Sequence, residues 1–275
     1  MTLTGTVDRV TSQADKIARF RELHVPGRPL VVANPWDVGT AKLLVSAGFA
    51  ALATTSSGHA ATLGRLDGGA TRDEVLAHAA ELVSAVEVPV SADLENGFGH
   101  TPEAVAATVT DAAATGLAGC SIEDYTGDPD TPFYDLPHAV ERIEAARAAS
   151  DLVLTARAEN FIRGNRDLAD TIARLQAFQE AGADVLYAPG VSRPDDLRSL
   201  LASVDRPVNV LVRPDMVPVA QLAEWGVARI SVGGAFNQAM IGALHHAARE
   251  LLDEGTYGFL NLAAEGRTQI AKAFG

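Results

Sequence analysis

The chain has 275 residues, of which 47% are hydrophobic and 21% are charged. This is about the usual size of a single α/β barrel, and it supplies enough apolar side chains for a large core, which argues against a disordered chain. The formal net charge of −13 argues against binding to nucleic acids or anionic membranes, whose phosphates attract basic surfaces. With Cys120 as its single cysteine, the chain cannot form an internal disulfide or a cysteine zinc cluster.

The ends and the composition of the chain also bear on its location. No apolar stretch is long enough to span a membrane, and Met1 to Asp15 is polar and lacks the apolar centre of a signal peptide. Together with the single cysteine, this predicts a soluble protein of the cytoplasm. No stretch rich in Gly, Ser and Pro divides the chain, so residues 1–275 are expected to form one domain.

After a leading helix, expected at about Asp8–Leu23, eight short apolar runs alternate with helical segments. The runs are continuous rather than alternating, as expected for parallel strands that are buried on both faces. The expected strands are Leu30–Asn34, Ala50–Thr54, Val88–Ala92, Gly119–Glu123, Leu152–Arg157, Ala183–Ala188, Val208–Val212 and Arg229–Val232. Eight such units favour a closed (β/α)₈ TIM barrel over an open doubly wound sheet.

Helix signals stand between these strands. Thr71 and Glu74 fit a capping box, and Thr101-Pro102-Glu103 supplies a cap, a first-position proline and an acid. One later segment carries apolar residues at helical spacing, namely Leu168, Ile172, Leu175 and Phe178. Three expected helices end in a glycine that a strand follows, namely Gly48, Gly116 and Gly182. The tail, Asp253–Gly275, could pack on its own barrel or on a neighbour's.

Acidic side chains gather where adjacent strands end, which is where barrels of this kind place their functional residues. Asp93, Glu95 and Glu123 would face one cavity, and their carboxylates would repel one another unless a cation lay between them. Oxygen ligands with little histidine favour Mg²⁺ or Mn²⁺ over zinc. Taken alone, Glu95 and Asp124 could equally be acids of a first helical turn or solvated loop residues.

Other strand ends could contact a substrate. Thr55-Ser56-Ser57-Gly58 offers hydroxyls and backbone amides that can hold a carboxylate or phosphoryl group, although a plain polar turn is the alternative. Arg157 could clamp a carboxylate through two hydrogen bonds, or form a structural ion pair with Glu123. Gly233-Gly234 resembles a barrel phosphate site, but a tight turn is the preferred interpretation. Cys120 is expected to be inert core.

Six short segments between about Val31 and Gly234 match a known family in their order and spacing. They are Asn34-Pro35-Trp36-Asp37, Thr54-Thr55-Ser56-Ser57-Gly58, Leu63-Gly64 with Asp67, Ala92-Asp93-Leu94-Glu95-Asn96-Gly97-Phe98-Gly99, Ser121-Ile122-Glu123-Asp124 and Thr155-Ala156-Arg157. In this pattern the chain resembles the isocitrate lyase/phosphoenolpyruvate mutase superfamily. The resemblance implies a barrel whose last helix is exchanged between subunits, usually in a dimer of dimers.

The resemblance also implies a site that binds Mg²⁺, or Mn²⁺, together with a small 2-oxo or enol carboxylic acid. Asp93 would be the direct metal ligand, and Asp67, Glu95 and Glu123 would hold the metal's water molecules. Asp67 and Glu123 would also serve catalysis, together with Arg157, which would stabilise an enolate-like oxygen. The residues expected to contact the substrate are Ser56, Ser57, Gly58, Trp36, Arg157 and Asn160.

The segment Tyr125–Tyr134 departs from the family pattern. Isocitrate and methylisocitrate lyases carry a Lys-Cys-Gly-His type loop there, whose cysteine works as acid and base, and this chain has no lysine, cysteine or histidine in the segment. Phosphonomutases usually place a lysine and an asparagine there, which are also missing, and Asp128 and Asp130 would repel a phosphonate. The remaining interpretation is a Mg²⁺-dependent lyase or hydrolase that breaks a C–C bond in an oxaloacetate-like 2-oxo or 2-hydroxy acid.

Two alternatives to this function stay open. One is an enzyme of C–P bonds, such as a phosphonopyruvate hydrolase or phosphonomutase, and the other is a non-catalytic barrel that binds 2-oxo acids. The glycine and prolines of the Tyr125–Tyr134 segment suit a loop that closes over the site. Tyr125, Tyr134 and His59 are the available proton-transfer groups, and a structural role is the stronger interpretation for each.

Overall fold

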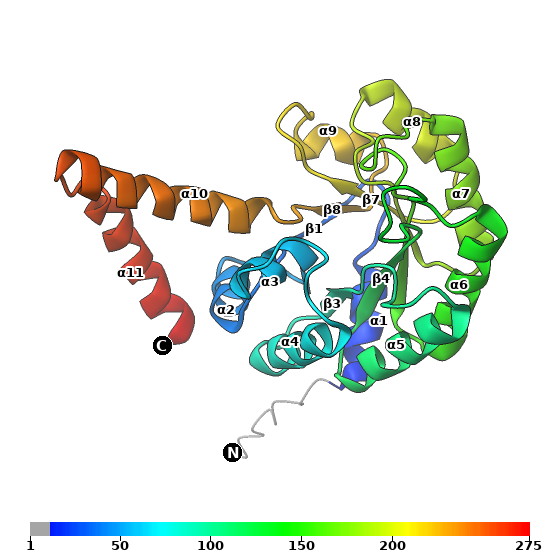
Figure 1. Cartoon of the computed structure of the whole chain (residues 1–275), viewed down its shortest axis with the longest axis horizontal. Helices are drawn as coiled ribbons and strands as arrows, with labels where there is room; N and C mark the ends of the chain where they lie inside the picture. Colours follow the sequence, from blue (N-terminus) through cyan, green and yellow to red (C-terminus); the bar gives the residue numbers. More distant parts are fainter. Residues whose placement is uncertain (1–11) are drawn as a thin grey trace, which may run out of the picture.

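The computed structural model describes residues 12–275, and its centre is a barrel of parallel strands (Figure 1). The 8 strands lie in the order β1-β8-β7-β6-β5-β4-β3-β2, and a parallel bridge from Ala33 to Leu52 joins β1 to β2. The strands are β1 Leu30–Val32, β2 Leu52–Ala53, β3 Val90–Asp93, β4 Gly119–Glu123, β5 Val153–Arg157, β6 Val185–Tyr187, β7 Val208–Leu211 and β8 Arg229–Ser231. The predicted (β/α)₈ barrel is therefore confirmed, with most strands shorter than expected.

Helices alternate with the strands and cover the outside of the barrel (Figure 1). They are α1 Gln13–Glu22, α2 Val38–Ser46, α3 Ser56–Thr62, α4 Arg72–Ala85, α5 Pro102–Ala114, α6 Leu136–Ala149, α7 Leu168–Glu180, α8 Pro194–Ala202, α9 Val219–Glu224, α10 Ala235–Arg249 and α11 Leu260–Phe274. A short π-helix, Glu250–Glu254, continues α10. For the leading helix, the expected residues from Asp8 to Thr11 lie outside the described part of the chain.

The predicted helix ends are present. Thr71 and Glu74 form a capping box at the start of α4, and the Thr101 side chain caps α5 ahead of Pro102. The glycines after α2, α5 and α7 have φ values of 105°, 90° and 99°, a left-handed conformation that side chains with a Cβ rarely adopt. These local signals fix where each helix stops and the chain turns back into the barrel.

Helix α1 covers the amino-terminal end of the barrel. Its Phe20 is fully buried against the first residues of β4 and β5. A Cβ added to Gly119 would lie 2.7 Å from the Phe20 ring, so glycine at the start of β4 is what lets this ring enter. The apolar contacts close one end of the barrel, which leaves the carboxyl ends of the strands as the open face.

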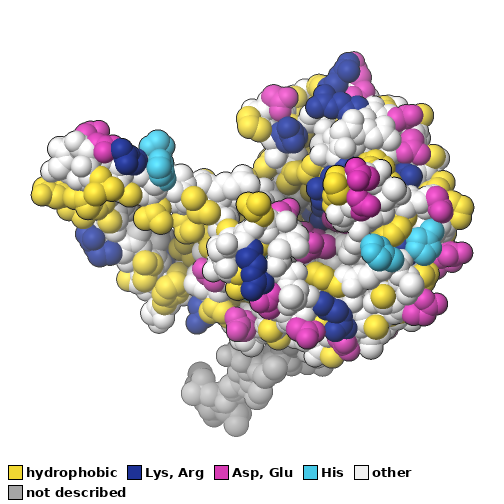
Figure 2. Space-filling view, in the orientation of Figure 1, with side chains coloured by type: hydrophobic (Ala, Val, Ile, Leu, Met, Phe, Trp, Pro, Cys, Tyr) yellow, Lys and Arg dark blue, Asp and Glu magenta, His cyan; other side chains and the backbone are white. Residues whose placement is uncertain are grey.

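The last two helices extend away from the barrel. Figure 1 shows α10 projecting from the end of β8, with α11 turning back to pack on α2. Apolar side chains gather along α10 and α11 on the face seen in Figure 2, and Met240, Leu244 and Leu252 are among the exposed ones. None of the helices between residues 12 and 275 combines the length and apolarity needed to cross a membrane.

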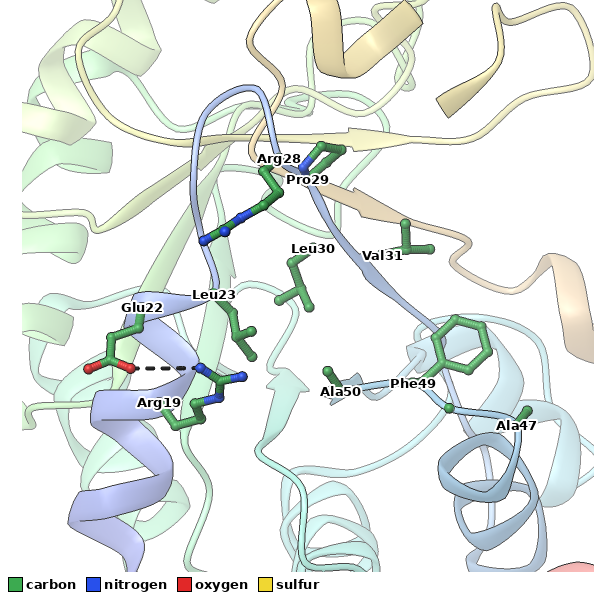
Figure 3. Close-up of a pocket in the computed structure, with 11 residues that line it drawn as sticks. Arg19, Glu22, Leu23, Arg28, Pro29, Leu30, Val31, Ala47, Phe49 and Ala50 are labelled. Carbon is green, nitrogen blue, oxygen red and sulfur yellow. Dashed lines mark ion pairs between the residues drawn. The ribbon is translucent and has the colours of Figure 1, made fainter. Parts of the chain in front are cut away.

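A cavity of about 630 Å³ opens on the outside of the barrel beside β1 (Figure 3). Its lining includes Leu23 after α1, Leu30 and Val31 of β1, and Phe49 in the turn after α2. In a (β/α)₈ barrel the helix that follows the eighth strand completes the outer ring next to the first strand. Since α10 points away instead, the outer side of β1 is left open.

Candidate active site

The turn from β2 into α3 presents the first polar wall of the site. The Thr55 hydroxyl accepts a hydrogen bond from Gly58 N at 3.3 Å and lies 3.1 Å from the Ser57 hydroxyl, so the turn is held by its own side chains. The turn is crowded from behind, since a Cβ at Gly58 would lie 3.2 Å from Trp36 Cβ. Ser56 and Ser57 line a cavity at the carboxyl end of the barrel, where the sequence predicted a carboxylate cradle.

Asn34 joins three strand ends beside this turn. Its side-chain nitrogen donates to Thr54 O at 3.0 Å, and its Oδ1 accepts from the backbone amides of Val232 and Gly233 at 3.1 and 2.9 Å. The amide of Gly233 is therefore already bonded within the protein. This arrangement supports the preferred interpretation of Gly233-Gly234 as a tight turn rather than a phosphate site.

Arg157, the last residue of β5, lies among three carboxylates from neighbouring strand ends. Its Nη1 is 3.0 Å from Asp93 Oδ1, and its Nη2 is 3.0 Å from Glu123 Oε2 and 2.9 Å from Glu159 Oε1. Although burial acts to lower it, these carboxylates raise the pKa of Arg157 well above its ordinary value. The guanidinium thus stays charged, and it lines the cavity as a fixed positive centre.

Asp93 presents a free oxygen to the cavity. Arg157 Nη1, Glu95 N and the Ser121 hydroxyl all donate to Oδ1, at 3.0, 3.2 and 3.4 Å. Oδ2 has no hydrogen-bond partner within the part of the chain that the structure describes, while the residue lines the cavity. One carboxylate oxygen held in place and the other open is a suitable arrangement for binding a hard cation directly.

Glu95 supplies a second open carboxylate. The residue lies in a left-handed turn with φ 50°, and its Oε1 is buried without a hydrogen-bond partner. Burial, helped by the charges of Asp93 and Asp67, raises the pKa of Glu95 to about 7. A cation nearby would remove this penalty, since it favours the ionised carboxylate.

The acids do not form a compact cage. Among residues 12–275, no three Asp, Glu, His or Cys side chains are close enough together to hold a metal ion directly. Mg²⁺ commonly binds through one or two carboxylates and keeps several water molecules, so this open arrangement fits a hydrated Mg²⁺ better than a zinc site. Such an ion would suit the roles expected from the sequence, with Asp93 as the direct ligand and Asp67, Glu95 and Glu123 on its water molecules.

Two connected spaces make up the candidate active site. The inner cavity, about 140 Å³, runs from Ser56 and Asp93 to residues of β6, β7 and β8. The outer chamber, about 400 Å³, is lined by Glu95, Glu123, Tyr125 and further residues of the neighbouring loops. Both spaces share Ser56, Asp67 and Arg157, so the predicted metal, substrate and catalytic residues on strands β2 to β5 do meet at one place.

Tyr125 and Arg163 form one side of the outer chamber. The Arg163 guanidinium lies over the Tyr125 ring at 3.7 Å, and it is also 3.8 Å from Glu123 Oε1 and 3.7 Å from Glu159 Oε2. Arg163 is about one-third exposed, with 35% of its side chain accessible. The Tyr125–Tyr134 segment thus begins at the chamber wall, next to a partly exposed cation.

Behind the chamber, Asp124 and Arg174 fix the strand ends. Asp124 is buried, accepts a hydrogen bond from Glu159 N at 2.8 Å and pairs with Arg174 at 3.1 Å. Burial raises the pKa of Asp124 to about 6. These contacts exclude the solvated-loop interpretation of Asp124 and give it a supporting role, since it holds the backbone that carries Glu159.

Several sequence-predicted residues lie outside the cavity wall. Trp36 packs behind the Ser56–Gly58 turn, and Asn160 is fully buried with its side chain donating to Asp170 at 2.6 Å. His59 stacks on His78 at a centroid distance of 4.0 Å on the far side of α3. The Tyr134 hydroxyl is 2.8 Å from His100 Nδ1, away from both spaces.

Other side chains of the site were not singled out from the sequence. Glu159 was noted only as a strand-end residue. Four more residues were not recognised because they lie within apolar strands, namely Tyr187, Asn209, Arg229 and Ser231. Cys120 is fully buried, and burial raises its pKa to about 12, as expected for an inert core thiol.

Comparison with known proteins finds relatives along most of the chain. A family model described as phosphoenolpyruvate phosphomutase matches residues 20–252. A crystal structure from Burkholderia cenocepacia J2315, provisionally called a lyase/mutase, is similar with a TM-score of 0.90 and 49% identity, covering 94% of this chain and 95% of that one. An uncharacterized protein of Mycobacterium tuberculosis is 35% identical over 237 residues, 85% of this chain and 89% of the relative. The crystal structure of 2,3-dimethylmalate lyase has a TM-score of 0.79 and 28% identity, covering 88% of this chain and 89% of that one.

Proposed function

This chain belongs to the phosphoenolpyruvate mutase/isocitrate lyase superfamily, and from this premise we propose that it is a Mg²⁺-dependent enzyme that breaks a C–C bond in a small 2-oxo or 2-hydroxy carboxylic acid. The observation that carries the proposal is the charged Arg157 fixed beside the open oxygen of Asp93. Arg157 can bind a negatively charged oxygen, and Asp93 can hold a metal ion beside it. Together these two groups suit an enolate as its charge develops. The similarity to 2,3-dimethylmalate lyase supports a lyase.

The metal supplies Lewis-acid chemistry when it is bound, by polarising oxygens of the substrate. Asp93 would hold it, with Asp67, Glu95 and Glu123 on its water molecules. Ser56 and Ser57 would bind the substrate carboxylate through their hydroxyls and amides, whereas Gly58, whose amide is bonded to Thr55 and which does not line the cavity, would only shape the turn. This places the reacting carbons between the turn and Arg157.

Arg157 would stabilise the product of bond breaking. When the C–C bond breaks, its electron pair stays on one fragment as an enolate, and negative charge develops on oxygen. The other fragment leaves as an aldehyde, ketone or carboxylic acid, after its hydroxyl group, or a water added to its carbonyl carbon, gives up a proton to solvent. The guanidinium is already oriented by Asp93, Glu123 and Glu159, so little reorganisation is needed when that charge appears. A proton must then reach the carbanionic carbon, and of the three candidate groups Tyr125 is the one that lines the chamber.

The test is product formation from a panel of 2-oxo and 2-hydroxy acids that includes oxaloacetate, followed by proton NMR. We expect a fragment of one acid to appear with Mg²⁺, and none with EDTA or with Asp93→Ala. The control is Asp195→Ala, which removes an exposed acid from α8. Cleavage that survives both EDTA and Asp93→Ala would refute the proposal.

A second candidate, C–P bond chemistry, is favoured by the description of the matching family model. Against it, the loop after β4 places Asp128 and Asp130 in exposed positions where the family would need groups that attract a phosphonate. Phosphorus NMR on phosphonopyruvate distinguishes the two candidates. We expect an unchanged spectrum, and a new phosphorus signal that depends on the enzyme would favour C–P chemistry.

We also propose that α10 is exchanged between two copies of the chain. Its apolar side chains are exposed, and the outer side of β1, where an eighth helix would lie, opens into the cavity of Figure 3. The α10 of a second copy would cover this cavity with its apolar face. The same contact would bury the apolar side chains that α10 exposes in a single copy. This supports a homo-oligomer, a dimer of dimers by the family's pattern.

A further inference from the structure

A second arginine lies inside the barrel, below the site described above. Arg229, the first residue of β8, is only 4% exposed. Its side chain crosses the barrel interior, where Nε donates to Asn209 Oδ1 of β7 at 2.9 Å and Nη1 donates to Thr155 Oγ1 of β5 at 3.1 Å. Asn209 in turn donates to the Ser231 hydroxyl at 3.0 Å. The guanidinium is therefore held in one orientation by neutral partners.

Unlike Arg157, Arg229 has no acidic partner. Within residues 12–275, no carboxylate lies within 4.0 Å of its guanidinium, and its Nη2 makes no hydrogen bond. Burial lowers its pKa to about 10, which still leaves it cationic at neutral pH. A buried cation that is bonded only to neutral groups is costly, and such a charge is normally paired.

The position of Arg229 indicates where a counterion can come from. Arg229 lines the inner cavity together with Ser56, Ser57 and Asp93. Asp93 is already bonded to Arg157, and Tyr187, the other acidic group nearby, has its pKa raised by burial to about 12 and is neutral. The unbonded Nη2 of the guanidinium is thus the part of Arg229 that is free to contact a molecule bound in this cavity.

Resting on the proposed function, we infer that Arg229 is the residue that binds a second acidic group of the substrate. The Ser56–Gly58 turn takes the carboxylate next to the reacting carbons, and the far end of the molecule reaches the barrel floor at Arg229. The substrate class is then a dianionic 2-oxo or 2-hydroxy acid, with a carboxylate at its far end. Arg229 acts in specificity, because its charge favours a second carboxylate over a methyl group of similar size.

Pairs of acids that differ only at the far end test the inference. Malate is compared with 2-hydroxybutanoate, and 2-oxoglutarate with 2-oxopentanoate, by calorimetry with Mg²⁺ present. In the wild type we expect the dianion of at least one pair to bind at least about 10-fold more tightly than its monoanionic partner. In Arg229→Gln that preference is lost while the affinity for the monoanion is kept, and Arg229→Lys restores part of it.

Two controls separate a binding role from a structural one. Arg193→Gln removes the same charge from an exposed position with 79% of the side chain accessible, and should leave both affinities unchanged. Melting without ligand is the second readout. The substitution removes a buried charge that has no acidic partner, but it also removes hydrogen bonds to Asn209 and Thr155. These effects oppose each other, so we expect Arg229→Gln to fold and to melt within about 5 °C of the wild type.

Each remaining result counts against the inference. It is overturned if the wild type binds both members of each pair equally, if Arg229→Gln weakens both members alike, or if that variant fails to fold. A wild type that binds none of the four acids with Mg²⁺ overturns the proposed function as well. Monoanion binding without any preference overturns the inference alone, which keeps the two failures distinct.

Discussion

Glu159 differs from the other acids around Arg157 in having no access to solvent. Its side chain is 0% exposed, one oxygen pairs with Arg157, and Oε2 has no hydrogen bond, with Arg163 3.7 Å away. Asp93 and Glu123 reach the cavity or the chamber, whereas Glu159 lines neither. We therefore regard Glu159 as a positioning residue, which holds the guanidinium in the orientation that the enolate oxygen needs.

Glu159→Gln tests this role. The amide keeps the shape of the side chain and removes its charge, so Arg157 is held less firmly. We expect kcat to fall about 10- to 100-fold with little change in KM, because small misplacements of a catalytic group have effects of this size. Steady-state kinetics on the acid that the enzyme cleaves give both constants. Glu144→Gln, an exposed acid of α6, is the control, and equal loss in both variants would contradict the assignment.

Two buried histidines predict how stability depends on pH. Burial lowers the pKa of His78 to about 4 and that of His24 to about 3. Both are neutral in the folded state, whereas in the unfolded chain they take up protons below about pH 6.5. The stability that these two histidines contribute is therefore complete above about pH 6.5 and is lost as the pH drops toward 4 and 3. Glu95 and Asp124, whose pKa values are raised, act in the opposite direction between pH 7 and pH 5.

Denaturant unfolding at pH 7 and pH 5 measures this loss. We expect about 1–2 kcal/mol from each buried histidine. His78→Gln should reduce the difference between the free energies of unfolding at the two pH values. It should also cost some stability at both, because the hydrogen bond between the His78 ring and Trp36 O, 3.0 Å long, is altered. His100→Gln, at an exposed position ahead of α5, should leave the difference as it is in the wild type. An unchanged pH dependence in His78→Gln would count against this explanation.

At the level of elements, the sequence predicted those features that depend on short-range patterns. The strand runs, the cap at Thr71 and the glycines after the helices are read within a few residues, and they are present in the structure. Most strands are shorter than expected because fewer of their residues pair with a neighbouring strand, as in β2, where Leu52 and Ala53 pair with Val90 and Ser91. The acids Asp93 and Glu123 were predicted to meet because parallel strands bring their carboxyl ends to one face.

The parts that could not be predicted depend on the closed barrel. Arg229 begins an apolar run, and only the closed ring brings it to Thr155, which is 74 residues away in the chain. Trp36 and Asn160 follow strands, as site residues do, but the turns that hold them direct their side chains away from the cavity. Sequence position gives the strand end, and the local turn decides where the side chain points.

The start of β4 gives an element-level prediction. In Gly119→Ala, the new Cβ would lie 2.7 Å from the Phe20 ring and 2.8 Å from Val153 O. We expect a loss of about 1–3 kcal/mol in the free energy of unfolding, because an overfilled core must shift. Denaturant unfolding measures it. Phe20→Leu makes room for the new methyl group, so the double variant should lose less stability than the two single variants added together. If the two losses simply add, this contact is not the cause of the destabilisation.

At the level of the whole molecule, we propose that the exposed apolar face of α10 and the open side of β1 form one interface between two copies of the chain. Leu244 of α10 is 68% exposed, and Leu252 of the π-helix that continues α10 is 75% exposed, which is unusual for side chains of this size. Truncation at Asp253 removes α11 and the end of the π-helix that continues α10, and it leaves α10 itself in place. We expect a smaller species on a sizing column, and Leu244→Glu should weaken assembly in the full chain. Unchanged elution of both would contradict helix exchange.

The central claim, that Arg157 and a cation on Asp93 stabilise an enolate, can be tested without knowing the substrate. Pyruvate in deuterium oxide exchanges its methyl protons when an enolate forms, and proton NMR records the loss of that signal. We predict faster exchange with the wild type and Mg²⁺, and none above background with EDTA, with Asp93→Ala or with Arg157→Gln. Exchange that continues in these three controls, or none with the wild type and Mg²⁺, would contradict the account.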